Sequence, residues 1–148
     1  MNLSEDETFM RLAIEEACKT APEKAYPNPR VGAVIVEEGE VVAFGRFQQD
    51  GGPHAERWAL THLGRLPNEG ATMYVTLEPC STEGRTGACT QALIDANISR
   101  VVVGAQDPTE AHRGNGIRVL SSAGVETETG VLEKECEAIN PGFSGHTT

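Results

Sequence analysis

The sequence lacks long hydrophobic runs and has few basic residues. No stretch approaches the roughly 20 apolar residues that a helix needs to cross a bilayer. Residues 1–6 are acidic and do not resemble a signal peptide, so we expect no membrane segment and a cytoplasmic protein. The chain has 12 Lys and Arg against 22 Asp and Glu, a formal charge of −10. Because nucleic-acid binding depends on clusters of basic residues, and the sequence has none, we expect no polynucleotide substrate.

Repeats, low-complexity segments and domain linkers are also missing. The 148 residues are 39% hydrophobic and 23% charged, as is typical of a globular protein of about one domain. We therefore expect residues 1–148 to form a single domain.

Four cysteines are present, and their uneven spacing does not indicate a disulfide framework. Cys18 and Cys136 occupy apolar positions of predicted helices, so we expect both to be buried thiols. Cys80 and Cys89 stand among Pro, Gly and polar residues. This second pair therefore requires a different explanation.

Hydrophobic periodicity predicts an alternation of strands and helices. Helices are predicted over 8–20, 54–63, 89–96, 117–123 and 131–139, and strands over 31–36, 41–47, 71–77, 100–104 and 125–129. Glu38-Gly39-Glu40 is typical of a hairpin turn between the first two strands, and the prolines at 22, 27 and 29 predict a loop. Strands followed by helices of this length favour parallel pairing with helices on both faces. The prediction is an α/β protein, a three-layer α/β/α sandwich with a mixed, mainly parallel five-stranded sheet.

His54-Ala55-Glu56, followed by Pro79-Cys80 and then Cys89, is the most informative pattern in the chain. One imidazole and two thiolates supply three zinc ligands and leave a fourth position for water. His54 and Cys89 lie near the starts of two predicted helices, where free N–H groups and the helix dipole favour a thiolate. Both segments follow carboxyl ends of predicted strands, where open α/β sheets usually bind ligands.

The main alternative is a purely structural zinc site. Such a site normally has a fourth Cys or His at short spacing, and none stands beside Cys80 or Cys89. His62 lies two helical turns beyond His54, which is too far to share one ion. Glu56 has no structural need to stand beside a metal. It therefore argues against a catalytically silent, zinc-binding partner subunit, which we keep as the least favoured hypothesis.

The pattern predicts hydrolytic removal of an amine from a nitrogen ring. Zinc lowers the pKa of bound water toward about 7, which supplies hydroxide at neutral pH. Glu56 is close enough to accept that proton, pass it to a ring nitrogen and then protonate the departing amine. Zinc deaminases carry H-x-E followed by P-C-x-x-C. The present sequence differs in one spacing, because Cys80 and Cys89 form a C-x8-C pattern.

With these residues the chain resembles the cytidine-deaminase-like superfamily, and it is most similar to the RibD-type pyrimidine deaminase domain of bacterial riboflavin biosynthesis. The C-x8-C spacing favours this branch over tRNA adenosine deaminases and cytidine deaminases. The resemblance extends over residues 8–143 and rests on Pro27-Asn28-Pro29-Arg30-Val31-Gly32, His54-Ala55-Glu56, Thr76-Leu77-Glu78-Pro79-Cys80-Ser81, Gly84-Arg85-Thr86, Cys89-Thr90, Gln106-Asp107-Pro108, Ala138-Ile139-Asn140 and Phe143.

The resemblance implies a zinc enzyme with a small-molecule substrate. Its implied zinc ligands are His54, Cys80 and Cys89, and its implied proton shuttle is the catalytic Glu56. The implied substrate contacts are Asn28, Ala55 and Asp107. Because deaminases of this superfamily often complete their pockets across subunit contacts, the resemblance also implies a homodimer or a larger homo-oligomer.

The sequence departs from the family pattern at positions that bear on the substrate. Thr82 replaces a histidine, Thr109 replaces an asparagine, and Gly87-Ala88 replaces a pair of prolines. In the family, the loops of the first two positions contact the phosphoribosyl-pyrimidine. We therefore favour an unphosphorylated, aminated, pyrimidine-like heterocycle. The riboflavin-pathway compound 2,5-diamino-6-(5-phosphoribosylamino)pyrimidin-4-one is the alternative.

A phosphorylated substrate would need a cation in this acidic chain. Arg85, between the two zinc cysteines, is the best candidate because a guanidinium binds phosphate oxygens in a two-pronged fashion. Arg30 and Arg113 are weaker candidates. The family's reductase domain has no counterpart in these 148 residues, so we expect a free-standing deaminase domain. A riboflavin enzyme of this kind could work beside a separate reductase, and a relative recruited to another aminated ring is the alternative.

Overall fold

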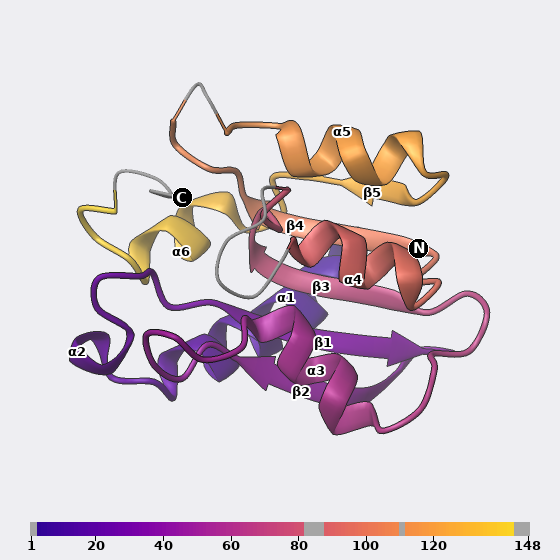
Figure 1. Ribbon diagram of the computed structural model, residues 1–148, viewed down its shortest axis with the longest axis horizontal. Coiled ribbons are helices and arrows are strands. Elements are labelled where there is room, and N and C mark those ends of the chain that lie inside the picture. The colour runs from indigo at the N-terminus through magenta and orange to yellow at the C-terminus, as the bar shows by residue number, and fades with distance from the viewer. Residues whose placement is uncertain (1–2, 82–87, 110–111, 144–148) are drawn as a thin grey trace.

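The computed structural model describes residues 3–81, 88–109 and 112–143, which form one sheet between two layers of helices (Figure 1). The helices are α1 (Leu3–Cys18), α2 (Pro22–Ala25), α3 (Ala55–Leu63), α4 (Cys89–Asp95), α5 (Asn115–Ser122) and α6 (Glu133–Ala138). The strands are β1 (Gly32–Glu37), β2 (Glu40–Arg46), β3 (Thr72–Leu77), β4 (Arg100–Ala105) and β5 (Glu126–Glu128).

The sheet has the strand order β2-β1-β3-β4-β5. β1 pairs antiparallel with both β2 and β3, whereas β3, β4 and β5 pair in parallel. β1 therefore runs opposite to the other four strands. The predicted mixed, mainly parallel sheet of five strands is confirmed.

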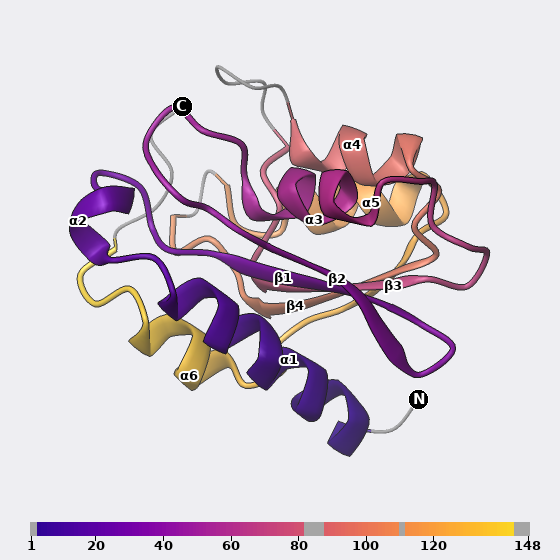
Figure 2. The same cartoon turned by 90° about the horizontal axis from the view of Figure 1, so that it is seen from below.

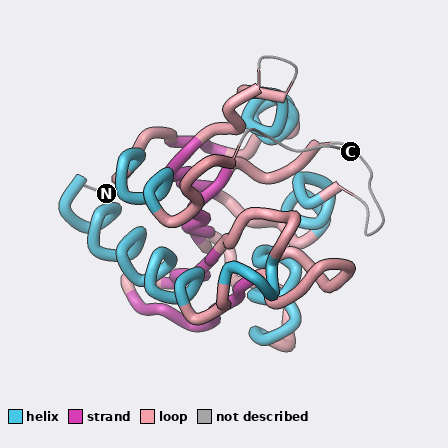
Figure 3. The backbone as a smooth tube through the Cα atoms, turned by 90° about the vertical axis from the view of Figure 1, so that its left-hand side faces the viewer, coloured by secondary structure: helices cyan, strands magenta, loops and turns pink. Residues whose placement is uncertain are grey.

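Helices cover both faces of the sheet. Figure 2 shows α1 and α6 on one face and α3, α4 and α5 on the other, and in Figure 3 the strands run through the middle of the molecule. Every residue of β1 and β3 is buried, because these strands pack against helices on both sides. Two apolar clusters fill the spaces between the sheet and the two helical layers. The predicted three-layer α/β/α sandwich is thus confirmed.

Gly45 of β2 allows α3 to approach the sheet at its first turn. A Cβ atom at this position would lie 2.2 Å from the Ala55 carbonyl oxygen and 2.4 Å from the Ala59 amide nitrogen. Both distances are far shorter than a van der Waals contact. The absence of a side chain at Gly45 therefore permits the first turn of α3 to lie close to the strand beneath it.

The structure corrects two details of the sequence analysis. Pro22 begins the short helix α2, where a loop was predicted, because proline is well tolerated in a first helical turn. Cys136 is buried as predicted, but the prediction for Cys18 is wrong, because this residue ends α1 and is exposed. Across the described ranges, no helix combines the length and apolarity that crossing a membrane requires.

Candidate active site

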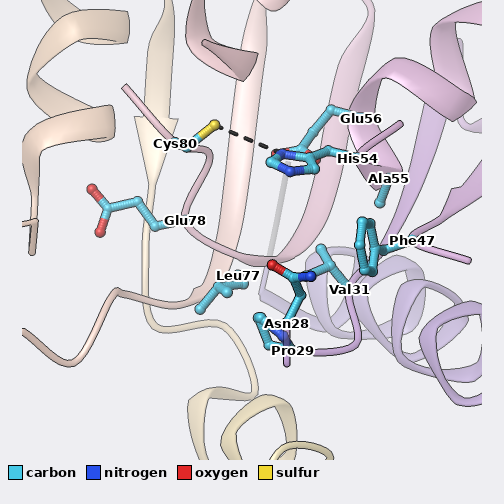
Figure 4. A pocket seen from close by; sticks show the side chains of 10 residues that line it. All are labelled: Asn28, Pro29, Val31, Phe47, His54, Ala55, Glu56, Leu77, Glu78 and Cys80. Carbon is cyan, nitrogen blue, oxygen red and sulfur yellow. Dashed lines mark hydrogen bonds between the residues drawn. The ribbon is translucent and has the colours of Figure 1, made fainter. Parts of the chain in front are cut away.

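The site lies where three strands end or begin at one edge of the sheet. Because β2 and β3 run in the same direction on either side of β1, their carboxyl ends lie beside the amino end of β1. The residues that precede β1, follow β2 and lie at and beyond the end of β3 line a pocket (Figure 4). Its lining consists of Asn28, Pro29, Val31, Phe47, His54, Ala55, Glu56, Leu77, Glu78 and Cys80.

His54 and Glu56 come from the start of α3. His54 is the residue before the helix, with extended backbone angles of φ −69° and ψ 162°, and Glu56 lies in the first turn. The ring of Phe47 packs edge-on against the imidazole of His54 with a centroid distance of 5.7 Å. The sequence around these residues thus places a histidine and a carboxylate at one pocket wall.

Three candidate metal ligands converge on this wall. His54 Nδ1, Cys80 Sγ and Cys89 Sγ all lie within 4.8 Å of one another. His54 Nδ1 is 3.0 Å from Cys89 Sγ and 3.7 Å from Cys80 Sγ. One nitrogen and two sulfur atoms form a donor set that suits zinc. These three residues therefore fit a zinc ion.

The two cysteines differ in how readily they ionise. A hydrogen bond from the Cys89 thiol, together with contacts from His54 and the Cys89 backbone N–H, lowers the pKa of Cys80 to about 4. The same contact with Cys80, followed by burial, raises the pKa of Cys89. The hydrogen bond with Cys80 also raises the pKa of His54. Cys80 therefore ionises more readily than Cys89.

Glu56 is a buried carboxyl group beside these ligands, with 3% of the residue exposed. Burial raises its pKa to about 7, and the negative charge of Cys80 adds to this effect, while His54 opposes it. A carboxyl group with a pKa near neutrality can both accept and release a proton at working pH. The surroundings of Glu56 therefore suit proton transfer.

The structure brings two of the predicted substrate contacts into the pocket. Ala55 and Asn28 both line it. The side-chain amide of Asn28 donates hydrogen bonds to Asp50 Oδ1 at 2.8 Å and to the Ala25 carbonyl oxygen at 3.4 Å. Asp50 therefore orients the amide of Asn28.

Asp107 lies outside this pocket. It lines a neighbouring pocket together with Cys80 and His112. Its carboxylate accepts hydrogen bonds from the backbone N–H of Thr109 at 3.0 Å and from the hydroxyl of Thr109 at 2.7 Å. Thr109 therefore forms hydrogen bonds with Asp107, the predicted substrate contact, within the same loop.

Two of the three arginines considered as phosphate contacts bind backbone carbonyl oxygens in the structure. Arg85 lies outside the described residues. The guanidinium of Arg30 donates to the carbonyl oxygens of Ile139 and Thr20, and that of Arg113 donates to the carbonyl oxygens of Asp107 and Pro108. Arg30 therefore links two distant backbone segments, and Arg113 stabilises the backbone of the loop after β4.

A reciprocal pair of hydrogen bonds anchors the segment that carries Asn28. The backbone N–H of Arg30 donates to Asn140 Oδ1 at 2.7 Å, and the side-chain amide of Asn140 donates back to the Arg30 carbonyl oxygen at 2.8 Å. This Arg30–Asn140 clasp ties the residues before β1 to the segment that follows α6. Asn140 was part of the family resemblance, but its spacing gave no indication of this partner.

Sequence reasoning missed two other residues of the site. Phe47 forms an apolar wall, and its position at the end of a predicted strand was the only available signal. Glu78 stood within the quoted Thr76–Ser81 stretch, but it was given no role. Figure 4 shows its carboxylate pointing away from His54 and Glu56.

Comparison with known proteins agrees with this geometry. Residues 3–105 match the family described as the cytidine and deoxycytidylate deaminase zinc-binding region. The chain therefore belongs to the cytidine and deoxycytidylate deaminase family.

Curated relatives narrow the similarity to one branch. The chain is 44% identical over 143 residues to the riboflavin biosynthesis protein RibD of Aquifex aeolicus, a match that covers 97% of this chain and 40% of the relative. It is 45% identical over 139 residues to RibD of Escherichia coli, covering 94% of this chain and 37% of the relative. The resemblance to the RibD type is confirmed, and the chain spans about 40% of the length of these relatives.

Solved structures give the same result. RibD of Acinetobacter baumannii superimposes with a TM-score of 0.90 at 41% identity, over 96% of this chain and 39% of that chain. A diaminohydroxyphosphoribosylaminopyrimidine deaminase/5-amino-6-(5-phosphoribosylamino)uracil reductase from Thermotoga maritima superimposes with a TM-score of 0.85 at 42% identity, over 93% of this chain and 40% of that chain. Both share the α/β/α architecture of the deaminase family.

Proposed function

We propose that this chain is a zinc-dependent hydrolytic deaminase of an aminated pyrimidine ring. The observation that carries the proposal is the convergence of His54, Cys80 and Cys89 within 4.8 Å, with the buried Glu56 beside them. In this proposal the three residues would hold a zinc ion. A bound zinc ion acts as a Lewis acid and lowers the pKa of water toward about 7. Membership in a family described by its zinc-binding region supports the same ion.

Glu56 moves the protons in the proposed reaction. Its carboxylate takes one proton from the attacking water and passes it to a ring nitrogen. It then takes the remaining proton of the added hydroxyl group and gives it to the departing amine. A carbon–oxygen bond forms, the carbon–nitrogen bond breaks, and ammonia leaves. A pKa of about 7 suits a group that must act first as a base and then as an acid.

The remaining pocket residues bind the ring. Val31, Phe47 and Leu77 present apolar surface, which would pack against a flat heterocycle and exclude water from the reacting carbon. Asn28, held by Asp50, provides an oriented amide for the polar edge of the ring.

Two substrate candidates differ in whether they carry a phosphate. The relatives support a phosphoribosylaminopyrimidine, since the Thermotoga maritima protein, 42% identical, is a deaminase of that class. The pocket supports an unphosphorylated ring. Among the lining residues that the structure describes there is no Lys or Arg, and Glu56 and Glu78 are both acidic. A phosphate therefore requires a cation from another part of the chain, for which Arg85 is our candidate.

The deciding experiment measures ammonia release by the zinc-loaded protein. The substrates are 2,5-diamino-6-(5-phosphoribosylamino)pyrimidin-4-one, its dephosphorylated form and the free aminopyrimidine. Turnover of the phosphorylated compound alone, with a raised KM in Arg85→Ala, would establish the riboflavin-pathway substrate. Turnover of the other two compounds would establish the unphosphorylated ring. A zinc-loaded protein inactive on a full panel of aminopyrimidines, purines and pterins would instead be the catalytically silent partner subunit.

We also propose a homodimer or larger homo-oligomer, supported by the resemblance to deaminases that share pockets between subunits. Light scattering of the active protein tests this assembly. A fully active monomer would overturn it.

A further inference from the structure

Glu78 is a buried carboxylate that the proposed reaction does not use. It follows the last residue of β3, and 3% of it is exposed. Its Oε1 accepts hydrogen bonds from the backbone N–H groups of Asp107 at 3.2 Å and Gly114 at 3.1 Å. Its Oε2 accepts from those of Gly116 at 2.9 Å and Ile117 at 3.4 Å. One side chain thus binds the loop after β4 and the first turn of α5.

Gly116 brings α5 into direct contact with the backbone beside Glu78. A Cβ atom at Gly116 would lie 2.1 Å from the Pro79 carbonyl oxygen and 3.3 Å from Glu78 Cγ. Any larger residue at position 116 must therefore move the helix or the Pro79 peptide. The Pro79 carbonyl belongs to the peptide bond that leads directly into Cys80.

The backbone of Glu78 is fixed from a third direction. Its N–H donates to the Ala105 carbonyl oxygen at 2.8 Å, at the end of β4. Strand β4, the loop at Asp107 and helix α5 therefore all hold the two residues that precede Cys80. Cys80 itself lies outside any helix or strand, so these contacts take the place of regular secondary structure.

We propose that Glu78 and Gly116 are positioning residues that hold Cys80 in place for metal binding. The inference rests on the proposed zinc site. Metal–ligand distances must be correct to about 0.2 Å, and groups around the ligands commonly change metal affinity by about 10–100-fold when they are altered. His54 and Cys89 obtain their positions from the starts of α3 and α4. Cys80 accepts hydrogen bonds from the first turn of α4, to its carbonyl oxygen from the Thr90 N–H at 3.1 Å and to its Sγ from the Cys89 N–H at 3.4 Å. The Glu78–α5 contact fixes the two residues that precede it.

The chemistry of the contact distinguishes positioning by hydrogen bonds from simple packing. Four N–H donors require two acceptor oxygens, which a carboxylate provides. In Glu78→Gln the side-chain NH₂ would face two of these donors, although the side chain keeps its size. Glu78→Asp is shorter but keeps both oxygens. If Glu78 only filled space, Gln would be tolerated better than Asp. Positioning by hydrogen bonds predicts the opposite order.

The test compares the full chain with Gly116→Ala, Glu78→Gln and Glu78→Asp. Ser122→Ala, at the exposed far end of α5, is the matched control. Zinc affinity is measured by competition with a chelator, and Cys80 coordination by the sulfur-to-cobalt charge-transfer absorption of the Co²⁺-substituted protein. Circular dichroism of the metal-free variants reports folding, and Cys80→Ser gives the signal expected when this ligand is lost.

We expect the zinc Kd to rise about 10–100-fold in Gly116→Ala and Glu78→Gln, with a weaker charge-transfer band, and to rise less in Glu78→Asp. Ser122→Ala should match the unaltered protein. Zinc affinity and absorption that stay unchanged in the folded Gly116→Ala and Glu78→Gln proteins would overturn this inference alone. Variants that bind zinc less well only because the metal-free protein is unfolded, or a Glu78→Gln that binds better than Glu78→Asp, would also overturn it. Failure of the unaltered chain to bind zinc would instead refute the proposed function.

Discussion

Asp6 and Glu56 are buried carboxyl groups on opposite faces of the sheet, and their surroundings shift their pKa values in opposite directions. Burial alone would raise both pKa values. For Asp6, hydrogen bonds from Arg100 and the Tyr74 hydroxyl outweigh burial and lower the pKa. For Glu56, burial outweighs the attraction of His54 and raises the pKa to about 7. A buried carboxylate stabilises the fold when hydrogen bonds outweigh the cost of its burial. When they do not, its pKa stays raised and the group remains available for proton transfer.

The largest expected effect is the loss of turnover in Glu56→Gln. The amide cannot shuttle protons, and general acid–base catalysis is worth about 10²–10⁴-fold. We expect ammonia release to fall by at least this factor, while metal analysis still finds zinc and circular dichroism still finds the fold. Near-normal ammonia release by this variant would refute the role proposed for Glu56.

A large loss of stability is expected for Asp6→Asn. The Asp6 carboxylate accepts hydrogen bonds from two nitrogens of Arg100, at 3.0 and 2.9 Å, and from the Tyr74 hydroxyl at 2.7 Å. The Arg100 side chain is only 12% exposed, so removal of the Asp6 charge leaves a poorly solvated guanidinium. Arg100 also forms an ion pair with Glu126, but the Glu126 side chain is 72% exposed. We expect the free energy of unfolding in urea to fall by about 3 kcal/mol. Turnover per folded molecule should be unchanged, and a loss of activity without a loss of stability would reverse the comparison.

The two carboxyl groups should respond to pH in opposite directions. Because the pKa of folded Asp6 lies below its ordinary value of 3.8, its stabilising contribution is complete above that pH and is lost on further acidification. Because the pKa of folded Glu56 lies above its ordinary value of 4.5, its contribution is present below pH 4.5 and is lost as the pH rises through about 7.

Melting temperatures of the metal-free protein test this contrast when each is compared with its amide variant. Between about pH 4.5 and pH 7, the melting temperature of the unaltered chain should fall relative to that of Glu56→Gln. The difference between the unaltered chain and Asp6→Asn should shrink only below about pH 3.8. Parallel pH profiles for the two pairs would contradict the contrast.

The smallest effect is expected at an ion pair between a buried carboxylate and an exposed arginine. Arg65 and Glu37 are 2.7 Å apart, but the Arg65 side chain is 47% exposed. Solvent screening weakens an ion pair with so exposed an arginine. Arg65→Ala should therefore change the urea midpoint far less than Asp6→Asn does. A loss equal to that of Asp6→Asn would show that burial is not what separates the two pairs.

The sequence predicted the features that depend on local patterns. Alternation of apolar runs located all five strands, and the His54, Cys80 and Cys89 pattern identified the edge of the sheet at which three ligand atoms converge. Element ends were less accurate, because helix ends depend on capping and tertiary contacts. Helix α1, for example, begins at Leu3 instead of residue 8.

Contacts between distant residues were not predictable. The backbone donors that Glu78 binds lie 29 to 39 residues further along the chain, a separation that no periodicity reveals. Asp107 stays a predicted substrate contact, and its carboxylate accepts hydrogen bonds from Thr109. The spacing of the sequence did not indicate these contacts.

The Arg30–Asn140 clasp also has a consequence for how the protein folds. It joins residues separated by 110 positions, and closing so long a loop carries an entropic cost before any contact compensates for it. During synthesis, Asn140 leaves the ribosome long after the strands around the pocket. The segment that carries Asn28 is therefore fastened in its final position only at a late stage. A nascent chain can assemble the sheet and gather its metal ligands before it has a finished pocket wall.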